Sequence, residues 1–192
     1  MSRFQRTICV LGTEIFSPFV LAGLLLVGVP LYSAQDWLWQ ALVGLATVVA
    51  IPWGLSLYMA HSGRASDRWL YHRKQRYGFY GLSLVSILGG ALVLLLTPSA
   101  YAVKVMICTL FGAVLAIALI NFVLKASAHA CVSAVFGTIA TGLVAPWFIP
   151  AAVVIHAVVC WSRWAMKKHT VLELIVGSLL GVLAGLIFLA LR

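Results

Sequence analysis

A polar segment at positions 160–181 contains residue types that can act on phosphate. The groups concerned are Ser162, Arg163, Lys167, Lys168, His169 and Glu173. Cations bind phosphoryl oxygens and offset charge in the transition state, and a neutral imidazole can attack phosphorus. A carboxylate can hold that imidazole in the required tautomer. Because Glu173 follows His169 by four residues, a helix would place the two side chains on one face.

Two further polar breaks carry groups that complete this chemistry. Positions 125–129 contain Lys125, Ser127 and His129, and the imidazole of His129 can protonate a leaving oxygen. Positions 61–77 contain five cations, which are Arg64, Arg68, Arg73, Lys74 and Arg76. No cysteine or carboxylate stands at metal-ligand spacing from either histidine, and there is no glycine-rich nucleotide loop. We therefore expect a reaction that uses neither a metal nor a cofactor.

The composition is that of a membrane protein rather than a soluble one. Of the 192 residues, 64% are hydrophobic and only 9% are charged, and the mean hydropathy is +1.10. A soluble domain of this size needs more polar surface, whereas a bilayer can surround apolar helices. The net charge of +9 favours an anionic lipid or phosphate as the partner, because nothing in the chain resembles a nucleic-acid-binding module.

The long apolar runs lack the alternation of barrel strands, so we predict an all-α bundle of transmembrane helices. Seven spans are expected, at about 15–33, 37–60, 78–97, 101–124, 130–145, 149–161 and 171–191. The run 130–161 is divided because a straight helix of that length would measure roughly 48 Å, against a hydrocarbon core of about 30 Å. Pro146 and Pro150 bracket a turn within it. The whole chain, 1–192, is predicted to form a single membrane domain whose first apolar run is a span rather than a cleaved signal.

Seven crossings place the N-terminus and the three polar breaks on one side of the membrane. That side carries eleven of the 13 lysines and arginines, while Lys104 and Arg192 remain for the other. The positive-inside rule makes the charged side cytoplasmic.

The motifs in these breaks resemble those of the type 2 phosphatidic acid phosphatase superfamily. The run from Ser162 and Arg163 through His169 to Glu173 is similar to that family's third signature, S-R-x5-H-x3-D, with glutamate for aspartate. The run 125–129 resembles the second signature, P-S-G-H, and more closely a K-x-S-x-H variant of small bacterial members. The basic run 72–76 resembles the segment that replaces the first signature, K-x6-R-P, in those members. The resemblance covers roughly 61–181, with the motifs in the family's order.

The resemblance implies a function and a role for each residue. The chain would be a lipid phosphate phosphatase of the bacterial cytoplasmic membrane, acting without a metal on phosphatidic acid, a polyprenyl phosphate or diphosphate, or a similar lipid. His169 would be the nucleophile that forms a phosphohistidine, Glu173 would orient it, and His129 would be the general acid. Phosphate would be bound by Arg163, Ser127, Lys125, Arg76 and a cation from Arg73 or Lys74.

Other functions remain open for the same sequence. A non-catalytic protein of the same fold could bind lipid phosphates or assist their transport. A transferase would pass the phosphoryl group to an acceptor other than water. At the residue level, basic clusters at span ends often act only as topology anchors, and interfacial histidines often serve packing. For His156, inside a span, we favour a hydrogen-bonded packing role. Gly177 and Gly181 form a G-x-x-x-G pattern that predicts close helix packing.

Overall fold

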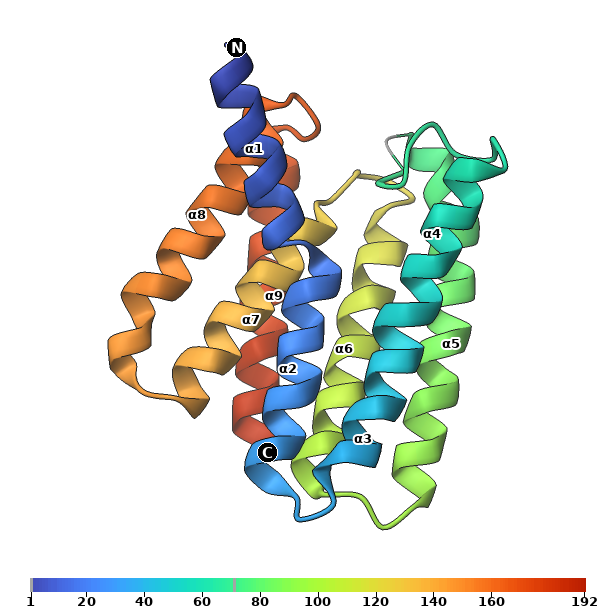
Figure 1. Cartoon of the computed structure of the whole chain (residues 1–192), viewed down its shortest axis with the longest axis vertical. Helices are drawn as coiled ribbons and strands as arrows, with labels where there is room; N and C mark the ends of the chain where they lie inside the picture. Colours follow the sequence, from blue (N-terminus) through green and yellow to red (C-terminus); the bar gives the residue numbers. More distant parts are fainter. Residues whose placement is uncertain (1, 71) are drawn as a thin grey trace.

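The computed structural model describes residues 2–70 and 72–192, which fold into a bundle of helices (Figure 1). In chain order the elements are α1 (Arg3–Ile15), α2 (Pro18–Ser33), α3 (Trp37–Gly44), a π-helical turn (Leu45–Ala50), α4 (Ile51–His61), a 3-10 turn (Arg73–Gln75), α5 (Arg76–Leu96), α6 (Tyr101–Ile120), α7 (Ala128–Leu143), a 3-10 turn (Pro146–Phe148), α8 (Ile149–Ala165) and α9 (Val171–Leu191). The described ranges contain no β-strand.

Six segments are long and apolar enough to cross a membrane. They are Arg3–Ser33, Trp37–His61, Arg73–Leu96, Tyr101–Ile120, Pro146–Ala165 and Val171–Leu191. The remaining apolar helix, α7, has 16 residues, so it measures only about 24 Å. It packs against α2, α8 and α9 and buries most of its side chains. The expected seven spans thus appear as six long segments and one short helix inside the bundle, which fits a multi-pass membrane protein.

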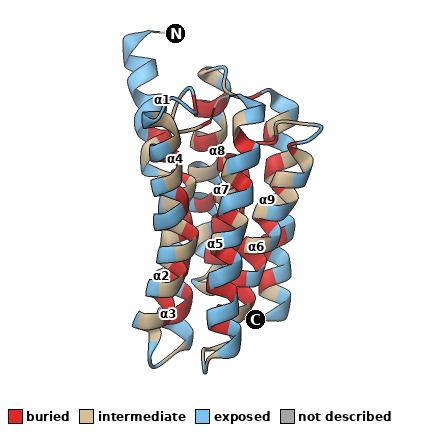
Figure 2. Ribbon diagram, turned by 90° about the vertical axis from the view of Figure 1, so that its right-hand side faces the viewer, coloured by how far each residue is buried: buried red, intermediate tan, exposed pale blue. Residues whose placement is uncertain are grey.

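The outer surface of the bundle is apolar, as a lipid environment requires. Leu82, Val85 and Leu96 on α5 are exposed, as are Leu179 and Leu183 on α9. Figure 2 shows buried residues between the helices and exposed ones facing outward along their whole length. So many large apolar side chains facing water would be unusual for a soluble monomer.

Two helix boundaries differ from the prediction. The first span was expected to begin near position 15, but α1 precedes it and the chain breaks at Phe16 and Ser17. The Ser17 hydroxyl accepts a hydrogen bond from the Val20 N–H, and Pro18 is the first residue of α2, so a new helix begins there. The second difference is that α8 continues to Ala165. Ser162 and Arg163 therefore lie on the last turns of a helix, whereas the predicted span ended at about 161.

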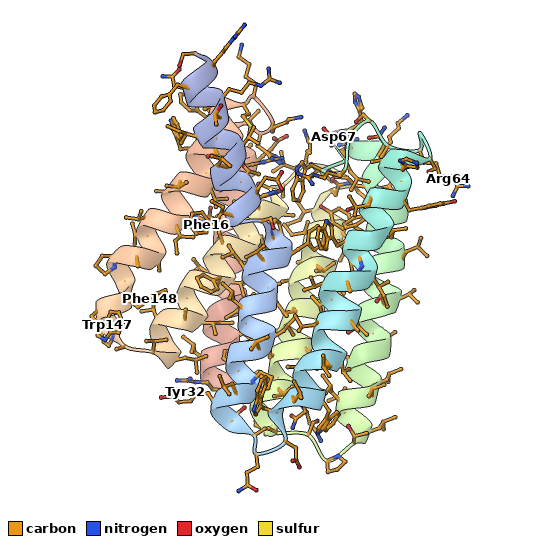
Figure 3. All side chains as sticks on the ribbon, in the orientation of Figure 1. Phe16, Tyr32, Arg64, Asp67, Trp147 and Phe148 are labelled. Carbon is orange, nitrogen blue, oxygen red and sulfur yellow. The ribbon has the colours of Figure 1, made fainter. Side chains whose placement is uncertain are left out.

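The N-terminus and the three polar breaks lie at the same end of the bundle (Figure 1). Asp67, in the loop after α4, is at this end, whereas Tyr32 and Trp147 lie toward the other (Figure 3). The breaks also touch one another, because Lys168 Nζ lies 3.2 Å from Asp67 Oδ2 and Lys125 Nζ donates to the Lys168 carbonyl oxygen at 2.9 Å. We call this region the loop end.

A row of glycines brings α9 against α7. A Cβ atom added at Gly177 would lie 2.5 Å from the Ser127 carbonyl oxygen, and one at Gly185 would lie 2.6 Å from Thr138 Cβ. Gly181 between them faces the backbone of Cys131 just as closely. The predicted G-x-x-x-G contact is therefore present and continues for a further turn.

Candidate functional site

Buried polar side chains gather at the loop end. Besides Thr13, Ser17 and Asn121, they include six from the predicted polar segments, which are Arg76, Ser127, His129, Ser162, Arg163 and His169. They come from α5, from the start of α7, from the end of α8 and from the connection before α9. Burial of polar and charged groups is unfavourable unless something satisfies them. Such a concentration marks this end as the candidate site.

His169 lies just before α9 and is held at one nitrogen. Its Nδ1 is 3.2 Å from Glu173 Oε2 and 3.2 Å from the carbonyl oxygen of Lys125. Both partners are acceptors, so the proton resides on Nδ1 and the Nε2 atom keeps its lone pair. The side chain of His169 is 1% exposed.

The contact between His169 and Glu173 arises differently from the prediction. The two residues do not share a helical face, because Thr170 is the N-cap of α9 and His169 precedes it. Thr170 and Glu173 instead form a capping box, in which the Thr170 N–H donates to Glu173 Oε2 at 2.9 Å and the Glu173 N–H donates to Thr170 Oγ1 at 3.3 Å. This box fixes the carboxylate beside the imidazole. The T-x-x-E spacing is the sequence signal for it.

His169 is neutral at physiological pH. Burial, followed by the positive charges of Arg163, Arg76 and Lys125, lowers the pKa of its imidazole to about 2. The Lys125 carbonyl that accepts from Nδ1 acts in the opposite direction but is the smallest contribution. A neutral imidazole with an available Nε2 lone pair is the form that can attack phosphorus.

Two buried guanidinium groups stand near His169 without a counter-ion. Arg163 is 3% exposed and Arg76 is 5% exposed. Within the described ranges neither forms an ion pair, since the three pairs there involve Arg68, Lys168 and His169. Arg76 donates from Nε to the Leu70 carbonyl at 2.9 Å, whereas Arg163 Nε is buried and has no hydrogen-bond partner. Buried cations of this kind are costly unless an anion compensates them.

The second polar break supplies Lys125, Ser127 and His129. Ser127 is the N-cap of α7, and its hydroxyl accepts from the Ala130 N–H at 3.3 Å. Burial, and then the nearby charge of Arg76, lower the pKa of the Lys125 ammonium, although Glu173 acts to raise it. His129 lies in the first turn of α7, and its Nε2 is buried without a hydrogen-bond partner.

A cavity of about 130 Å³ opens beside the two histidines. Its polar lining includes Arg68, Arg76, His129 and His169, and the rest is mainly apolar side chains of α2, α5, α6 and α7. Trp69 covers His129, with the two ring centres 4.8 Å apart and the rings edge to face. We call this space the inner cavity. The lining therefore has a charged end beside an apolar interior.

Of the six predicted phosphate ligands, Arg76 alone is among the residues that line this cavity; Lys125, Ser127 and Arg163 are not in its wall, and neither are Arg73 and Lys74. Arg73 and Lys74 lie in the 3-10 turn before α5 with exposed side chains. Arg73 donates instead to the Val123 carbonyl at 2.9 Å, beyond the end of α6. Of the basic run, only Arg76 points inward.

Sequence reasoning missed Trp69, which packs on His129. For Asp67 it left open an ion pair with a neighbouring arginine or a role in the site, and the structure pairs Asp67 with Lys168 instead.

His156 belongs to a separate polar cluster, as expected for a packing role. Its Nδ1 is 2.8 Å from Ser133 Oγ and its Nε2 is 3.1 Å from Ser178 Oγ. These contacts link α8 to α7 and α9. His156 does not line the inner cavity.

Comparison of the chain with protein-family models, with curated proteins and with solved structures found no match. The fold and the site themselves define a multi-pass helical membrane protein with buried arginines and histidines at one end of the bundle.

Proposed function

We propose that this protein is an integral membrane phosphatase that hydrolyses a phosphomonoester or diphosphate of a lipid or polyprenyl carrier. The observation that carries the proposal is the environment of His169. Its Nδ1 lies between two acceptors, the Glu173 carboxylate and the Lys125 carbonyl, and its ring is surrounded by cations. This arrangement keeps the His169 imidazole neutral, with Nε2 free to act as the nucleophile, next to cations that can bind a phosphate.

The proposed reaction has two steps. In the first, His169 Nε2 forms a bond to phosphorus, the bond from phosphorus to the leaving oxygen breaks, and His129 gives its proton to that oxygen. In the second, a water oxygen attacks the phosphohistidine, its proton passes to His129, and the phosphorus–nitrogen bond breaks to release inorganic phosphate. Burial, followed by the nearby charges of Arg163, His169 and Arg76, lowers the pKa of His129, and the substrate dianion supplies the negative charge that lets it hold a proton.

The arginines and Lys125 serve the phosphoryl group throughout. Arg163, Arg76 and Lys125 bind its oxygens, and the charge that develops in the transition state is stabilised by groups already in place. Ser127 contributes its hydroxyl as a further phosphate ligand. Glu173 keeps the proton on Nδ1 of His169 and stabilises the imidazole as positive charge develops.

The lipid character of the substrate follows from the location of the site. The charged end of the inner cavity lies at the loop end of the bundle, and its interior is lined by apolar side chains. A phosphate at the charged end would therefore place an apolar chain inside the bundle. The excess of lysine and arginine at this end favours the cytoplasmic face of a bacterial inner membrane.

A phosphate-release assay on a panel of lipid phosphates tests this proposal. The full-length protein in bilayer nanodiscs is given phosphatidic acid, phosphatidylglycerol phosphate, and polyprenyl mono- and diphosphates, each with and without a chelator. We expect metal-independent phosphate release from at least one of them. Binding without turnover of any member would favour a non-catalytic lipid-binding protein, and product that forms only with an added alcohol acceptor would favour a transferase.

A further inference from the structure

A second, larger cavity lies at the loop end, outside the inner cavity. Its volume is about 480 Å³. It is lined by residues of α1, of the loop after α4, of α8 and of the connection to α9, which are Arg6, Val10, Thr13, Glu14, Trp69, Arg163, Met166 and Lys168. We call it the outer cavity.

The outer cavity carries an excess of positive charge. Arg6, Arg163 and Lys168 face it, against one carboxylate, Glu14. Glu14 is already paired with Arg68, whose side chain joins α1 to the loop after α4. Lys168 is also bonded to Asp67, at 3.2 Å. An anion that enters this space would meet cations from two sides of the cavity.

Two buried polar groups in its wall have no hydrogen-bond partner. Thr13 is 2% exposed and Arg163 is 3% exposed. The atoms concerned are Thr13 Oγ1 and Arg163 Nε, one from α1 and one from α8. Both are donors, and an unsatisfied buried donor costs about 1–3 kcal/mol. A ligand with several acceptor oxygens would satisfy both.

Trp69 separates the outer cavity from the inner one. Its side chain lines both spaces. The Trp69 ring packs on His129 and on Phe19 of α2, and the centres of the Trp69 and Phe19 rings are 6.2 Å apart. His129 and His169 line only the inner cavity. The residues that line only the outer one include Arg6, Thr13, Arg163 and Lys168. The outer cavity is thus a distinct space that adjoins the proposed reaction site.

We propose that the outer cavity is a second phosphate-binding subsite, formed by Arg6 and Thr13 of α1 together with Arg163 and Lys168. Its ligand is a phosphate group, either free inorganic phosphate or the headgroup phosphate of an anionic phospholipid. This assignment concerns binding alone and stands whether or not the neighbouring site turns over a lipid.

Titration of the full-length protein with inorganic phosphate tests the subsite. The protein is placed in phosphatidylcholine nanodiscs and binding is followed by isothermal titration calorimetry. We expect two binding components, one of which weakens about tenfold in Arg6→Gln, because a charge-assisted hydrogen bond is lost. Arg3→Gln is the matched control, since it removes the same charge from the same helix but does not line the cavity.

Thr13→Val separates a ligand-binding role from a structural one. Valine has nearly the same shape, and removal of an unpaired buried hydroxyl leaves stability unchanged or improves it. We expect the melting temperature to hold while the same phosphate component weakens several-fold. Isotherms of Arg6→Gln and Thr13→Val that superimpose on those of wild type and Arg3→Gln would overturn the subsite.

A second set of nanodiscs identifies the source of the phosphate. If phospholipid headgroups occupy the subsite, anionic lipid in the disc weakens the Arg6-dependent component by competition, whereas an unchanged component assigns the subsite to inorganic phosphate. Loss of turnover on every lipid phosphate, with this component retained, would refute the proposed phosphatase and leave the subsite standing. Turnover of a lipid phosphate without an Arg6-dependent binding component would refute the subsite and leave the proposed phosphatase standing.

Discussion

The Ser127 N–H donates to the carbonyl oxygen of Glu173 at 3.0 Å, joining the start of α7 to the start of α9. This backbone bond brings the N-cap of one helix against the capping box of the other. Because Ser127 and His129 lie on one side of it and His169 and Glu173 on the other, it sets how the two halves of the site meet. The close approach depends on the glycine row of α9.

Gly181→Ala should therefore damage the site from a distance. The added methyl would collide with the Cys131 carbonyl oxygen, which is backbone and cannot move without displacing α7. Overpacking of this kind costs about 1–3 kcal/mol, so we expect a lower melting temperature and reduced phosphate release. Gly112→Ala on α6 is the control, since nothing lies within 4 Å of its added Cβ. If both variants behave alike, the glycine row does not position the site.

The two roles of Glu173 can be separated by a pair of substitutions. Glu173→Gln keeps an acceptor for the capping box but loses the charge beside His169, so the melting temperature should hold while turnover falls about 10²- to 10⁴-fold. Thr170→Ala removes the cap hydroxyl and leaves the carboxylate, so it should cost about 1 kcal/mol of stability and little activity per folded molecule. If Glu173→Gln instead lowers the melting temperature and leaves turnover per folded molecule unchanged, Glu173 acts only as a helix cap.

Arg163→Met should lower the phosphatase activity without lowering the stability of the protein. The substitution removes a buried charge that has no counter-ion and replaces it with an apolar chain of similar length. We expect the melting temperature without ligand to stay the same or rise, because a costly buried cation is gone. A rise would correspond to a gain in stability of up to about 1–4 kcal/mol. Phosphate release should fall by at least 10²-fold, since transition-state charge is no longer offset. A marked loss of stability would mean that Arg163 is already compensated in the free protein.

Neutral His169 makes stability depend on pH in a defined direction. Its pKa is about 2 in the folded protein, below the usual 6.5, so between these values the unfolded chain binds a proton that the folded one does not. The stabilisation is complete above pH 6.5 and declines as pH falls, by up to about 1.4 kcal/mol per pH unit. We expect the melting temperature to drop less between pH 7.5 and 5.5 in His169→Gln than in wild type. Equal drops would contradict a neutral, buried imidazole.

Much of the fold could be predicted because the apolar runs are long and bounded by polar breaks. The parity of the crossings correctly placed the three breaks at one end, and the proline pair correctly divided 130–161 (Figure 1). The prediction failed where local capping decides the boundary. Ser17 and Pro18 begin a new helix, and α8 extends past Arg163 because no breaker interrupts it.

The site itself was only partly readable from spacing. His169 and Glu173 meet because Thr170 and Glu173 form a capping box. The T-x-x-E spacing is a local signal for this box, whereas the prediction assumed that His169 and Glu173 share a helical face. The prediction named Arg76 together with one cation from Arg73 or Lys74, but Arg76 alone of these three is buried, because tertiary packing and not local spacing decides which side chain turns inward. The contacts of Trp69 and the outer cavity involve residues far apart in sequence, for which no local pattern exists.

The most direct test is phosphate release by His169→Ala, measured on whichever lipid phosphate the wild-type protein hydrolyses. His61→Ala serves as the control, because His61 is an exposed histidine at the end of α4. We predict that His169→Ala remains folded in the bilayer, with release reduced to background, and that His61→Ala keeps wild-type release. Full phosphate release by His169→Ala would contradict the assignment of His169 as the nucleophile.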